Sequence, residues 1–290
     1  MIILDGKEVA THWKNKIQTE VNQYVLQGCR SPKLAIIKVG LNPASAIYVK
    51  RKMEACEQVG IETIFHSFEE ISQTHLIELI ESLNKTNDVD GILVQLPLPN
   101  SIAEHKIINK VSASKDVDGL HPLNIGYLAS GQPQFVSATP LGITYLLNYY
   151  NLDLVNKSMV IIGRSNIVGR PLFHIFSAPP YNCTVTLAHS KTKNLSTISS
   201  AADILMVAIG KPQFIDESYI KPDAIIVDVG INRIHLAGKD KVVGDVDFER
   251  VKNLCSAITP VPGGVGLTTI SALLHNTLKA YKNNISHARN

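Results

Sequence analysis

The strongest constraint on the fold is an alternation of apolar, strand-length runs with helical patterns, which occurs twice along the 290-residue chain. In the first block we predict strands at residues 33–39, 62–68 and 91–95, and helices at residues 43–59 and 74–85. Strands that alternate with helices in this way form a parallel sheet with helices on its faces. The first block therefore predicts an α/β domain.

The same pattern begins again after residue 150. Here we predict strands at residues 159–162, 184–188, 204–209 and 225–229. A helix at residues 139–150 connects the blocks, with Thr139 as its N-cap and Pro140 at its first position. We therefore expect two α/β domains, each a mostly parallel sheet flanked by helices, at residues 1–138 and 139–267. A last helical segment, 268–290, would pack back on the first domain.

Composition excludes several classes of protein. The net charge is only +3 and no basic tract occurs, which argues against nucleic acid as a partner. No apolar run approaches the ~18 residues of a membrane span, and the short apolar start before Asp5 does not resemble a signal peptide. The four cysteines show no metal-ligand spacing. We expect a cytoplasmic protein without a metal ion and without a membrane partner.

The second domain carries a candidate dinucleotide loop. Gly163 directly follows the predicted strand 159–162, and Gly169 opens the next helix. Glycines at these points permit a tight turn and close packing, and the helix N-terminus offers N–H donors to a phosphate. The spacing departs from G-x-G-x-x-G, so an ordinary turn between strand and helix remains an alternative. This pattern predicts that the second domain is Rossmann-like.

The residues after the second strand of that domain favour NADP over NAD. An NAD site usually places an acid there to bind the ribose hydroxyls. This chain instead has the segment HSKT at residues 189–192, and Arg164 could lie nearby. Hydroxyl and cationic groups suit a 2′-phosphate, although a solvated loop would look the same.

In the first domain, Lys52 falls on the apolar face of helix 43–59, one turn after Tyr48. A lysine there can extend to water, or it can face a pocket where burial lowers its pKa and suits it to proton transfer. Gln95 ends an apolar strand, where it could hold the lysine or only cap the strand. Asp116 and Asp118 lie in a predicted loop, where either could bind a ligand or simply form a turn.

Taken together, these motifs closely resemble the bifunctional methylenetetrahydrofolate dehydrogenase/methenyltetrahydrofolate cyclohydrolase family, over essentially the whole chain. The motifs that carry the resemblance occur in one order: VGLNPASAIYVKRKMEACEQVGI, DGILVQLPLP, KDVDG, GRSNIVGRP, HSKT, GDVDF and TPVPGGVG. The resemblance implies oxidation of 5,10-methylenetetrahydrofolate with NADP, then hydrolysis of the methenyl product to 10-formyltetrahydrofolate. It also implies tetrahydrofolate derivatives as ligands in a cleft between the domains, and a homodimer.

The resemblance also assigns roles to individual residues. Lys52 resembles the family's catalytic lysine, Gln95 the glutamine that positions it, and Tyr48 the tyrosine that packs over the folate. Asp118 resembles the aspartate that anchors the pterin. The other implied folate contacts are Pro262 and Gly263, and the implied cofactor contacts are Gly163, Arg164, Ser165, Ser190 and Ile231.

The sequence departs from the family pattern at Ala138 and at Leu267–Thr268, which leaves the detail of the pocket there open. Three other functions remain possible from the sequence. The chain could have only one of the two activities, it could be another two-domain dehydrogenase that uses NADP, or it could bind NADP without catalysis.

Overall fold

The computed structural model describes residues 1–236 and 238–289, and the chain divides into two compact units. Unit 1 comprises Met1–Thr11 and Thr139–Thr269, and unit 2 comprises His12–Ala138 and Ile270–Asn290. The division between the units falls within two long helices, α1 (Gly6–Leu26) and α10 (Val265–Arg289). Residues 1–11 thus belong to unit 1, in contrast to the predicted domain 1–138, because their strand pairs with the unit 1 sheet as described below.

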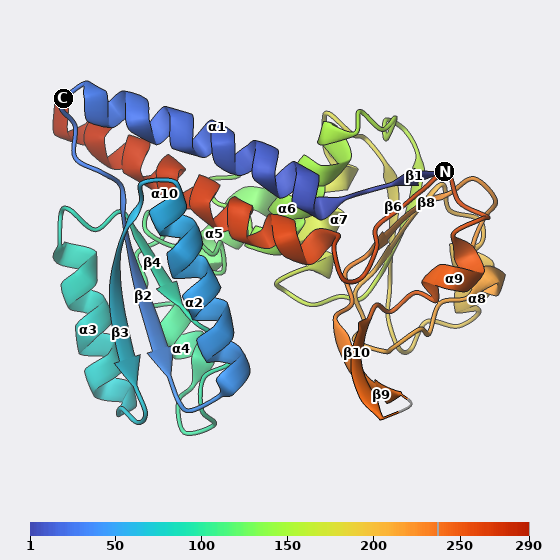
Figure 1. Cartoon of the computed structure of the whole chain (residues 1–290), viewed down its shortest axis with the longest axis horizontal. Coiled ribbons are helices and arrows are strands. Elements are labelled where there is room, and N and C mark those ends of the chain that lie inside the picture. The colour runs from blue at the N-terminus through green and yellow to red at the C-terminus, as the bar shows by residue number, and fades with distance from the viewer. Residues whose placement is uncertain (237, 290) are drawn as a thin grey trace. The chain divides into compact units, whose positions relative to one another are not determined.

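Unit 2 is built on a parallel sheet with the strand order β3-β2-β4. The strands are β2 (Lys33–Val39), β3 (Glu62–Phe68) and β4 (Gly91–Val94), and the helices are α2 (Pro43–Gln58), α3 (Gln73–Lys85), α4 (Glu104–Ile108) and α5 (Pro122–Ala129). Leu76 and Ile80 of α3 pack with Ile37 and Ile92 on one face of the sheet, and α2 covers the other face (Figure 1). The sheet is thus covered on both faces, as a parallel sheet of apolar strands requires.

Unit 1 contains, within the described residues, a six-stranded parallel sheet in the order β1-β11-β8-β7-β5-β6. Its strands are β1 (Ile2–Ile3), β5 (Ser158–Ile162), β6 (Thr184–Ala188), β7 (Ile204–Val207), β8 (Ile225–Asp228) and β11 (Ala257–Ile258). Ile2 and Ile3 pair with Ala257 and Ile258, which places the start of the chain in this sheet.

Helices cover both faces of the unit 1 sheet. They are α6 (Ala138–Tyr149), α7 (Gly169–Ser177), α8 (Leu195–Ser199), the short 3-10 helix η1 (Glu217–Tyr219) and α9 (Phe248–Val251). Along β5, Met159 and Ile161 pack in the cluster with α6 and α7, whereas Val160 and Ile162 pack in the cluster on the opposite face. This alternation follows from the two-residue period of a strand. An antiparallel pair, β9 (Asn232–Leu236) and β10 (Lys239–Val243), projects from β8.

The α/β class with parallel sheets flanked by helices is confirmed. Helix α6 begins at Ala138, one residue before the N-cap predicted at Thr139, and α10 begins at Val265, three residues before the segment predicted at 268–290. The sequence patterns predict no element at the residues of α1, α4, α5, α8, α9, β1, β9, β10 or β11.

Candidate active site

The side chain of Lys52 is oriented by a hydrogen bond to Gln95, a glutamine at the end of a strand. Lys52 lies on α2, and its Nζ donates a hydrogen bond to Oε1 of Gln95 over 2.9 Å. Gln95 directly follows β4, and its backbone N–H still donates to the carbonyl of Ile37 (2.8 Å). The Nε2 group of Gln95 donates to the Leu96 carbonyl (2.7 Å), which fixes the amide so that its oxygen faces Lys52. The predicted pairing of Lys52 with Gln95 is thus present in the structure.

The surroundings of Lys52 favour its neutral amine. Burial among protein atoms is the main effect and lowers the pKa of Lys52 below its ordinary value. The negative charge of Asp118 acts in the opposite direction and offsets part of this effect. Cys56, one turn further along α2, is fully buried, and burial raises the pKa of its thiol to about 12. Burial therefore moves the pKa of Lys52 downward and that of Cys56 upward, so the lysine is the group of this helix face that is suited to proton transfer.

Asp118 and Asp116 lie in the same loop but have different surroundings. The Asp116 carboxylate is buried and accepts hydrogen bonds from the backbone N–H groups of Leu120 (3.2 Å) and His121 (2.8 Å) and from Nδ2 of Asn124 (2.8 Å). Asp116 thus holds the start of α5. Burial raises the pKa of Asp118, Lys52 lowers it, and the charge of Asp116 raises it further. Since Asp116 is saturated by its own chain, Asp118 is the carboxylate of this loop that is suited to a ligand.

Tyr48 lies one helical turn before Lys52 on α2, and 44 % of its surface is exposed. An exposed aromatic ring beside a half-buried lysine can stack on a planar ligand. Lys52, Gln95 and Asp118 are therefore brought together in unit 2, with Tyr48 on the same helix face.

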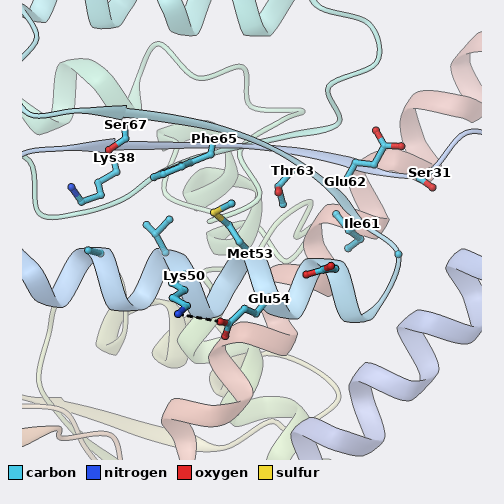
Figure 2. A pocket seen from close by; sticks show the side chains of 14 residues that line it. Ser31, Lys38, Lys50, Met53, Glu54, Ile61, Glu62, Thr63, Phe65 and Ser67 are labelled. Atoms are coloured by element: carbon cyan, nitrogen blue, oxygen red, sulfur yellow. Dashed lines mark ion pairs between the residues drawn. The ribbon is translucent and has the colours of Figure 1, made fainter.

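A cavity of about 790 Å³ lies on a different face of α2 (Figure 2). Val49, Met53 and Glu57 of α2 line it, together with Thr63 and Phe65 of the edge strand β3. Figure 2 also shows the ion pair of Lys50 with Glu54 at this cavity (3.9 Å). Lys52, Gln95 and Asp118 are not among the lining residues, so this cavity is separate from the candidate active site.

In unit 1, the loop that begins at Gly163 has the features of a phosphate-binding turn. Gly163 follows β5 with φ of 122°, and a Cβ atom added there would lie 2.3 Å from the Ala208 carbonyl oxygen. A Cβ atom on Gly169, the first residue of α7, would lie 1.9 Å from the Gly163 oxygen. Neither position tolerates a side chain, and the turn brings the N-terminus of α7 to the carboxyl end of β5. Arg164 is exposed, and so is Ser165, whose Oγ accepts from Val168 N (3.1 Å).

The loop after β6 lies at the same edge of the sheet, because β5 and β6 are parallel neighbours. His189 closes it: its backbone N–H donates to Thr192 Oγ1 (2.9 Å), and its Nδ1 accepts from the Lys191 N–H (3.1 Å). Ser190 and Lys191 are exposed, so hydroxyl and ammonium groups face outward beside the Gly163 turn. This arrangement fits an anionic ligand such as a nucleotide phosphate.

The remaining predicted contacts also belong to unit 1. Ile231 is 55 % exposed in the segment between β8 and β9. Pro262 is exposed, and the Gly263 carbonyl accepts a hydrogen bond from Gly6 N (2.9 Å) at the start of α1.

Sequence reasoning missed the buried aspartates Asp228 and Asp245, which accept several hydrogen bonds at the carboxyl ends of β7 and β8. The only available signal was the GDVDF motif, for which the sequence suggested no role. Among the described residues, no group of three histidine, cysteine or acidic side chains is arranged to hold a metal ion. In the same residues, no helix combines the length and apolar character needed to cross a membrane.

Comparisons with known proteins agree with this geometry. Family models described as tetrahydrofolate dehydrogenase/cyclohydrolase match the chain twice, the catalytic domain at residues 4–118 and the NAD(P)-binding domain at residues 137–285. The bifunctional protein FolD of Sulfurihydrogenibium sp. (strain YO3AOP1) is 50 % identical over 284 residues, which cover 97 % of this chain and 98 % of that protein.

Two solved structures are similar over nearly their whole length. The bifunctional FolD methylenetetrahydrofolate dehydrogenase/cyclohydrolase of Campylobacter jejuni has a TM-score of 0.92 and 45 % identity, covering 98 % of this chain and 99 % of that one. The Trypanosoma brucei enzyme, solved with NADP cofactor and an inhibitor, has a TM-score of 0.92 and 31 % identity, covering 98 % of both chains. With both domain models matched and half of the residues shared with a full-length relative, the chain belongs to the tetrahydrofolate dehydrogenase/cyclohydrolase family.

Proposed function

We propose that this chain oxidises 5,10-methylenetetrahydrofolate to the 5,10-methenyl form with NADP and then hydrolyses that product to 10-formyltetrahydrofolate. Membership of the family supports both activities on one chain. The observation that carries the proposal is the hydrogen bond of Lys52 with Gln95 (2.9 Å), within the electrostatic reach of Asp118. These three side chains lie within the part of the chain that matches the catalytic-domain model.

NADP would supply the nicotinamide ring that accepts the hydride. The residues of unit 1 fit such a ligand. Gly163 and Gly169 allow the tight turn that brings the N-terminus of α7 to the carboxyl end of β5, where the helix dipole favours negative charge. Arg164, Ser165 and Ser190 would contact the phosphates and ribose, and Ile231 the remaining part of the cofactor.

The preference for NADP over NAD rests on the end of β6. The exposed segment there offers Ser190 and Lys191 and no carboxylate. A 2′-phosphate would gain hydrogen bonds and charge pairing from these groups, whereas a free ribose would lack the acid that usually binds its hydroxyls.

Lys52 would transfer the protons of the hydrolytic step. Its neutral amine can take one proton from the water that adds to the methenyl carbon. When the C–N bond breaks, the resulting ammonium can return this proton to the ring nitrogen, and the remaining hydroxyl proton passes to solvent as the formyl C=O forms. Burial favours the neutral form needed to begin this cycle, and the charge of Asp118 stabilises the ammonium formed during it. Gln95 holds the amine in place throughout.

The substrate would be held by groups around this lysine. Asp118 has a raised pKa and no saturating partners of the kind that hold Asp116, so it can bind the N–H and amino groups of a pterin. Tyr48 would pack over the folate ring. Pro262 and Gly263 complete the proposed folate contacts on the evidence of the sequence motif TPVPGGVG alone.

Two further proposals rest on the resemblance to the family and on the composition of the chain. The chain would form a homodimer, which light scattering of the purified protein would test. It would act in the cytoplasm without a nucleic-acid or membrane partner, which fractionation of the source cells would test.

The proposed function is tested by an absorbance assay with purified wild-type protein and Lys52→Met. We expect the wild type to form reduced nicotinamide with NADP and to hydrolyse added methenyltetrahydrofolate faster than buffer does. In Lys52→Met, methionine keeps the side-chain length without the amine, so the hydrolytic rate should fall by about 100-fold or more. NADP binding by Lys52→Met serves as the control for folding.

Each alternative gives a different result. Reduction of NADP without accelerated hydrolysis, or the reverse, indicates a single activity. A folded wild type that binds NADP but has neither activity indicates a cofactor-binding protein or a dehydrogenase for another substrate. A Lys52→Met protein that hydrolyses at the wild-type rate would refute the role of Lys52.

A further inference from the structure

Two buried carboxylates lie at the carboxyl ends of the central strands of unit 1. Asp245, in the GDVDF motif, is fully buried, and Asp228, the last residue of β8, is 3 % exposed. Neither belongs to the set of residues predicted to contact the cofactor. Burial of ionisable side chains is costly unless their oxygens are hydrogen-bonded, so the partners of these two carboxylates show what they stabilise.

The Asp245 carboxylate gathers a short loop around itself. Its Oδ2 accepts from the backbone N–H groups of Ile209 (2.7 Å) and Gly210 (2.9 Å), and its Oδ1 accepts from Lys211 N (2.8 Å) and from Nδ2 of Asn232 (2.8 Å). Three successive N–H groups that point to one site form a nest for an anion. Gly210 has φ of 66°, which allows the loop to curl in this way. The protein fills this nest with its own carboxylate.

Asp228 in turn fixes the backbone that carries Asp245. Its Oδ1 accepts from Asp245 N (3.0 Å) and Gly230 N (2.9 Å), and its Oδ2 accepts from Val246 N (2.9 Å). Two glycines permit this close approach. A Cβ atom on Gly230 would lie 2.3 Å from Cγ of Asp245, and one on Gly244 would lie 1.8 Å from Oδ2 of Asp228. The two carboxylates and the loops that they bind therefore form one hydrogen-bonded network, the Asp228–Asp245 network.

The Asp228–Asp245 network borders the Gly163 turn. The loop held by Asp245 follows β7, the parallel neighbour of β5, and the turn at Gly163 packs against the carbonyl of Ala208 in that loop. The sequence order changes direction at this place in the sheet, since β6 lies on one side of β5 and β7 on the other. Nucleotides bind at such a switch point in open parallel sheets.

Asp228 and Asp245 also bind the two residues that flank Ile231 in the sequence. The preceding residue, Gly230, donates to Asp228, and the following residue, Asn232, donates to Asp245. An exposed isoleucine in a loop has no fixed position unless its neighbours are anchored, and here both anchors are buried carboxylates.

We propose that Asp245, held in place by Asp228, is a positioning residue of the dinucleotide site, which fixes the loop at residues 208–211 and the segment around Ile231 in the shape that binds the cofactor. The proposal rests on the NADP site described under Proposed function. Asp245 acts through the two loops, because its own oxygens are buried and engaged by four N–H donors.

The test uses Asp245→Asn, with Asp247→Asn as its matched control. Asparagine keeps the size of the side chain but places an NH₂ group against N–H donors, so at least one loop N–H group loses its acceptor. Asp247 belongs to the same motif, but within the described residues its carboxylate accepts from Arg250 N at the start of α9 (3.4 Å), a capping role that asparagine also fills.

Three quantities are measured for each full-length protein: the Kd for NADP by calorimetry, the cyclohydrolase rate on methenyltetrahydrofolate without cofactor, and the Tm. For Asp245→Asn we expect a Kd about tenfold higher or more, with a cyclohydrolase rate within about twofold of wild type. Asp247→Asn should leave both near wild type. A role confined to stability would lower the Tm and weaken both measurements together.

Asn232→Ala keeps the proposal testable if Asp245→Asn does not fold. It removes one donor to Asp245 and should raise the Kd for NADP by a few fold without changing the cyclohydrolase rate. A wild-type Kd in folded Asp245→Asn or Asn232→Ala would overturn the proposal. A wild type that does not bind NADP would refute the proposed cofactor site itself, and this inference with it.

Discussion

Lys52 of α2 donates a hydrogen bond to the side-chain oxygen of Gln95, at the end of β4, across 2.9 Å. The acceptor is a neutral amide, so it orients the lysine without adding a charge that would hold it as an ammonium ion. Burial can then lower the pKa of Lys52, with Asp118 as the opposing charge. A glutamine at this position thus orients Lys52 without raising its pKa, as a carboxylate would.

The first prediction replaces this amide with a carboxylate. In Gln95→Glu, a negative charge would lie about 3 Å from Nζ of Lys52 and would raise the pKa of the lysine. Because hydrolysis begins with the neutral amine, the pH profile of the cyclohydrolase rate should move to higher pH. At pH 7 the rate should fall by about tenfold or more. The profile is measured from pH 6 to pH 10.

Gln95→Met serves as the control for this prediction. It removes the hydrogen bond but adds no charge, so its activity should fall without an upward movement of the profile. If Gln95→Glu is folded and its profile coincides with that of the wild type, Lys52 is not the group whose titration governs hydrolysis.

Much of the parallel architecture could be predicted from the sequence, because buried strands are short apolar runs. Strands β2, β3 and β6 have the predicted bounds. Helix α1 was missed, although Val9, Trp13, Ile17 and Val21 form a buried stripe at helical spacing along it. Strands β9 and β10 were missed for a different reason: their residues are mixed in charge and pair with each other, so no apolar run marks them.

The candidate site could be predicted only in part. Helical periodicity placed Lys52 on the apolar face of α2, and the strand end placed Gln95. Only the resemblance to the family singled out Asp118. The loop sequence by itself could not separate Asp116 from Asp118, because the distinction depends on which carboxylate the turn at Leu120 and His121 engages. The roles of Asp228 and Asp245 could not be predicted for the same reason, since their contacts join segments that only the folded sheet brings together.

A second prediction concerns cofactor preference. Ser190→Asp would place an acid at the end of β6, where it could bind ribose hydroxyls but would repel a 2′-phosphate. We expect kcat/KM with NADP to fall by about 100-fold, whereas kcat/KM with NAD stays level or rises. Steady-state rates with both cofactors measure the ratio. Ser190→Ala, which adds no charge, should lose far less of the activity with NADP.

An unchanged preference in Ser190→Asp would show that the loop after β6 does not contact the 2′ position. The cyclohydrolase rate without cofactor, which depends on residues of unit 2, reports whether the variant is folded.

A third prediction addresses the stability of unit 2. Asp90, which precedes β4, accepts from Nη1 (2.7 Å) and Nη2 (2.6 Å) of Arg30, from Lys33 N (2.8 Å) and from Nδ2 of Asn284 in α10 (2.9 Å). The Asp90 side chain is fully buried, whereas that of Arg30 is 34 % exposed. Asp90→Ala removes the acceptor for four donors and should lower the free energy of unfolding by about 3 kcal/mol.

Asp88→Ala is the matched control. Asp88 pairs with Lys33 at 2.6 Å but is half exposed, so its loss should destabilise the protein far less than the loss of Asp90 does. Urea unfolding monitored by circular dichroism measures both variants. Equal destabilisation by the two substitutions would contradict the role assigned to the buried pair.

The last prediction concerns the pH dependence of stability that arises from the raised pKa of Asp228. Burial is the main cause that raises its pKa from 3.8 to about 7, its three backbone hydrogen bonds oppose this, and the charge of Asp245 adds to it. The folded protein therefore keeps this proton over a pH range in which the unfolded chain has already lost it. Stability from this group is greatest at low pH, declines as the pH rises from about 4 to about 7, and is constant above that range.

Asparagine at this position cannot titrate, so Asp228→Asn removes the effect. Between pH 5 and pH 8, the free energy of unfolding of the wild type should fall by about 2.5 kcal/mol relative to that of Asp228→Asn. Urea unfolding of both proteins at several pH values gives this difference, in which the titration of all shared groups cancels. A difference that stays constant from pH 5 to pH 8 would mean that Asp228 is ionised throughout, with its three N–H donors and the surrounding loops outweighing the cost of burial and the repulsion from Asp245.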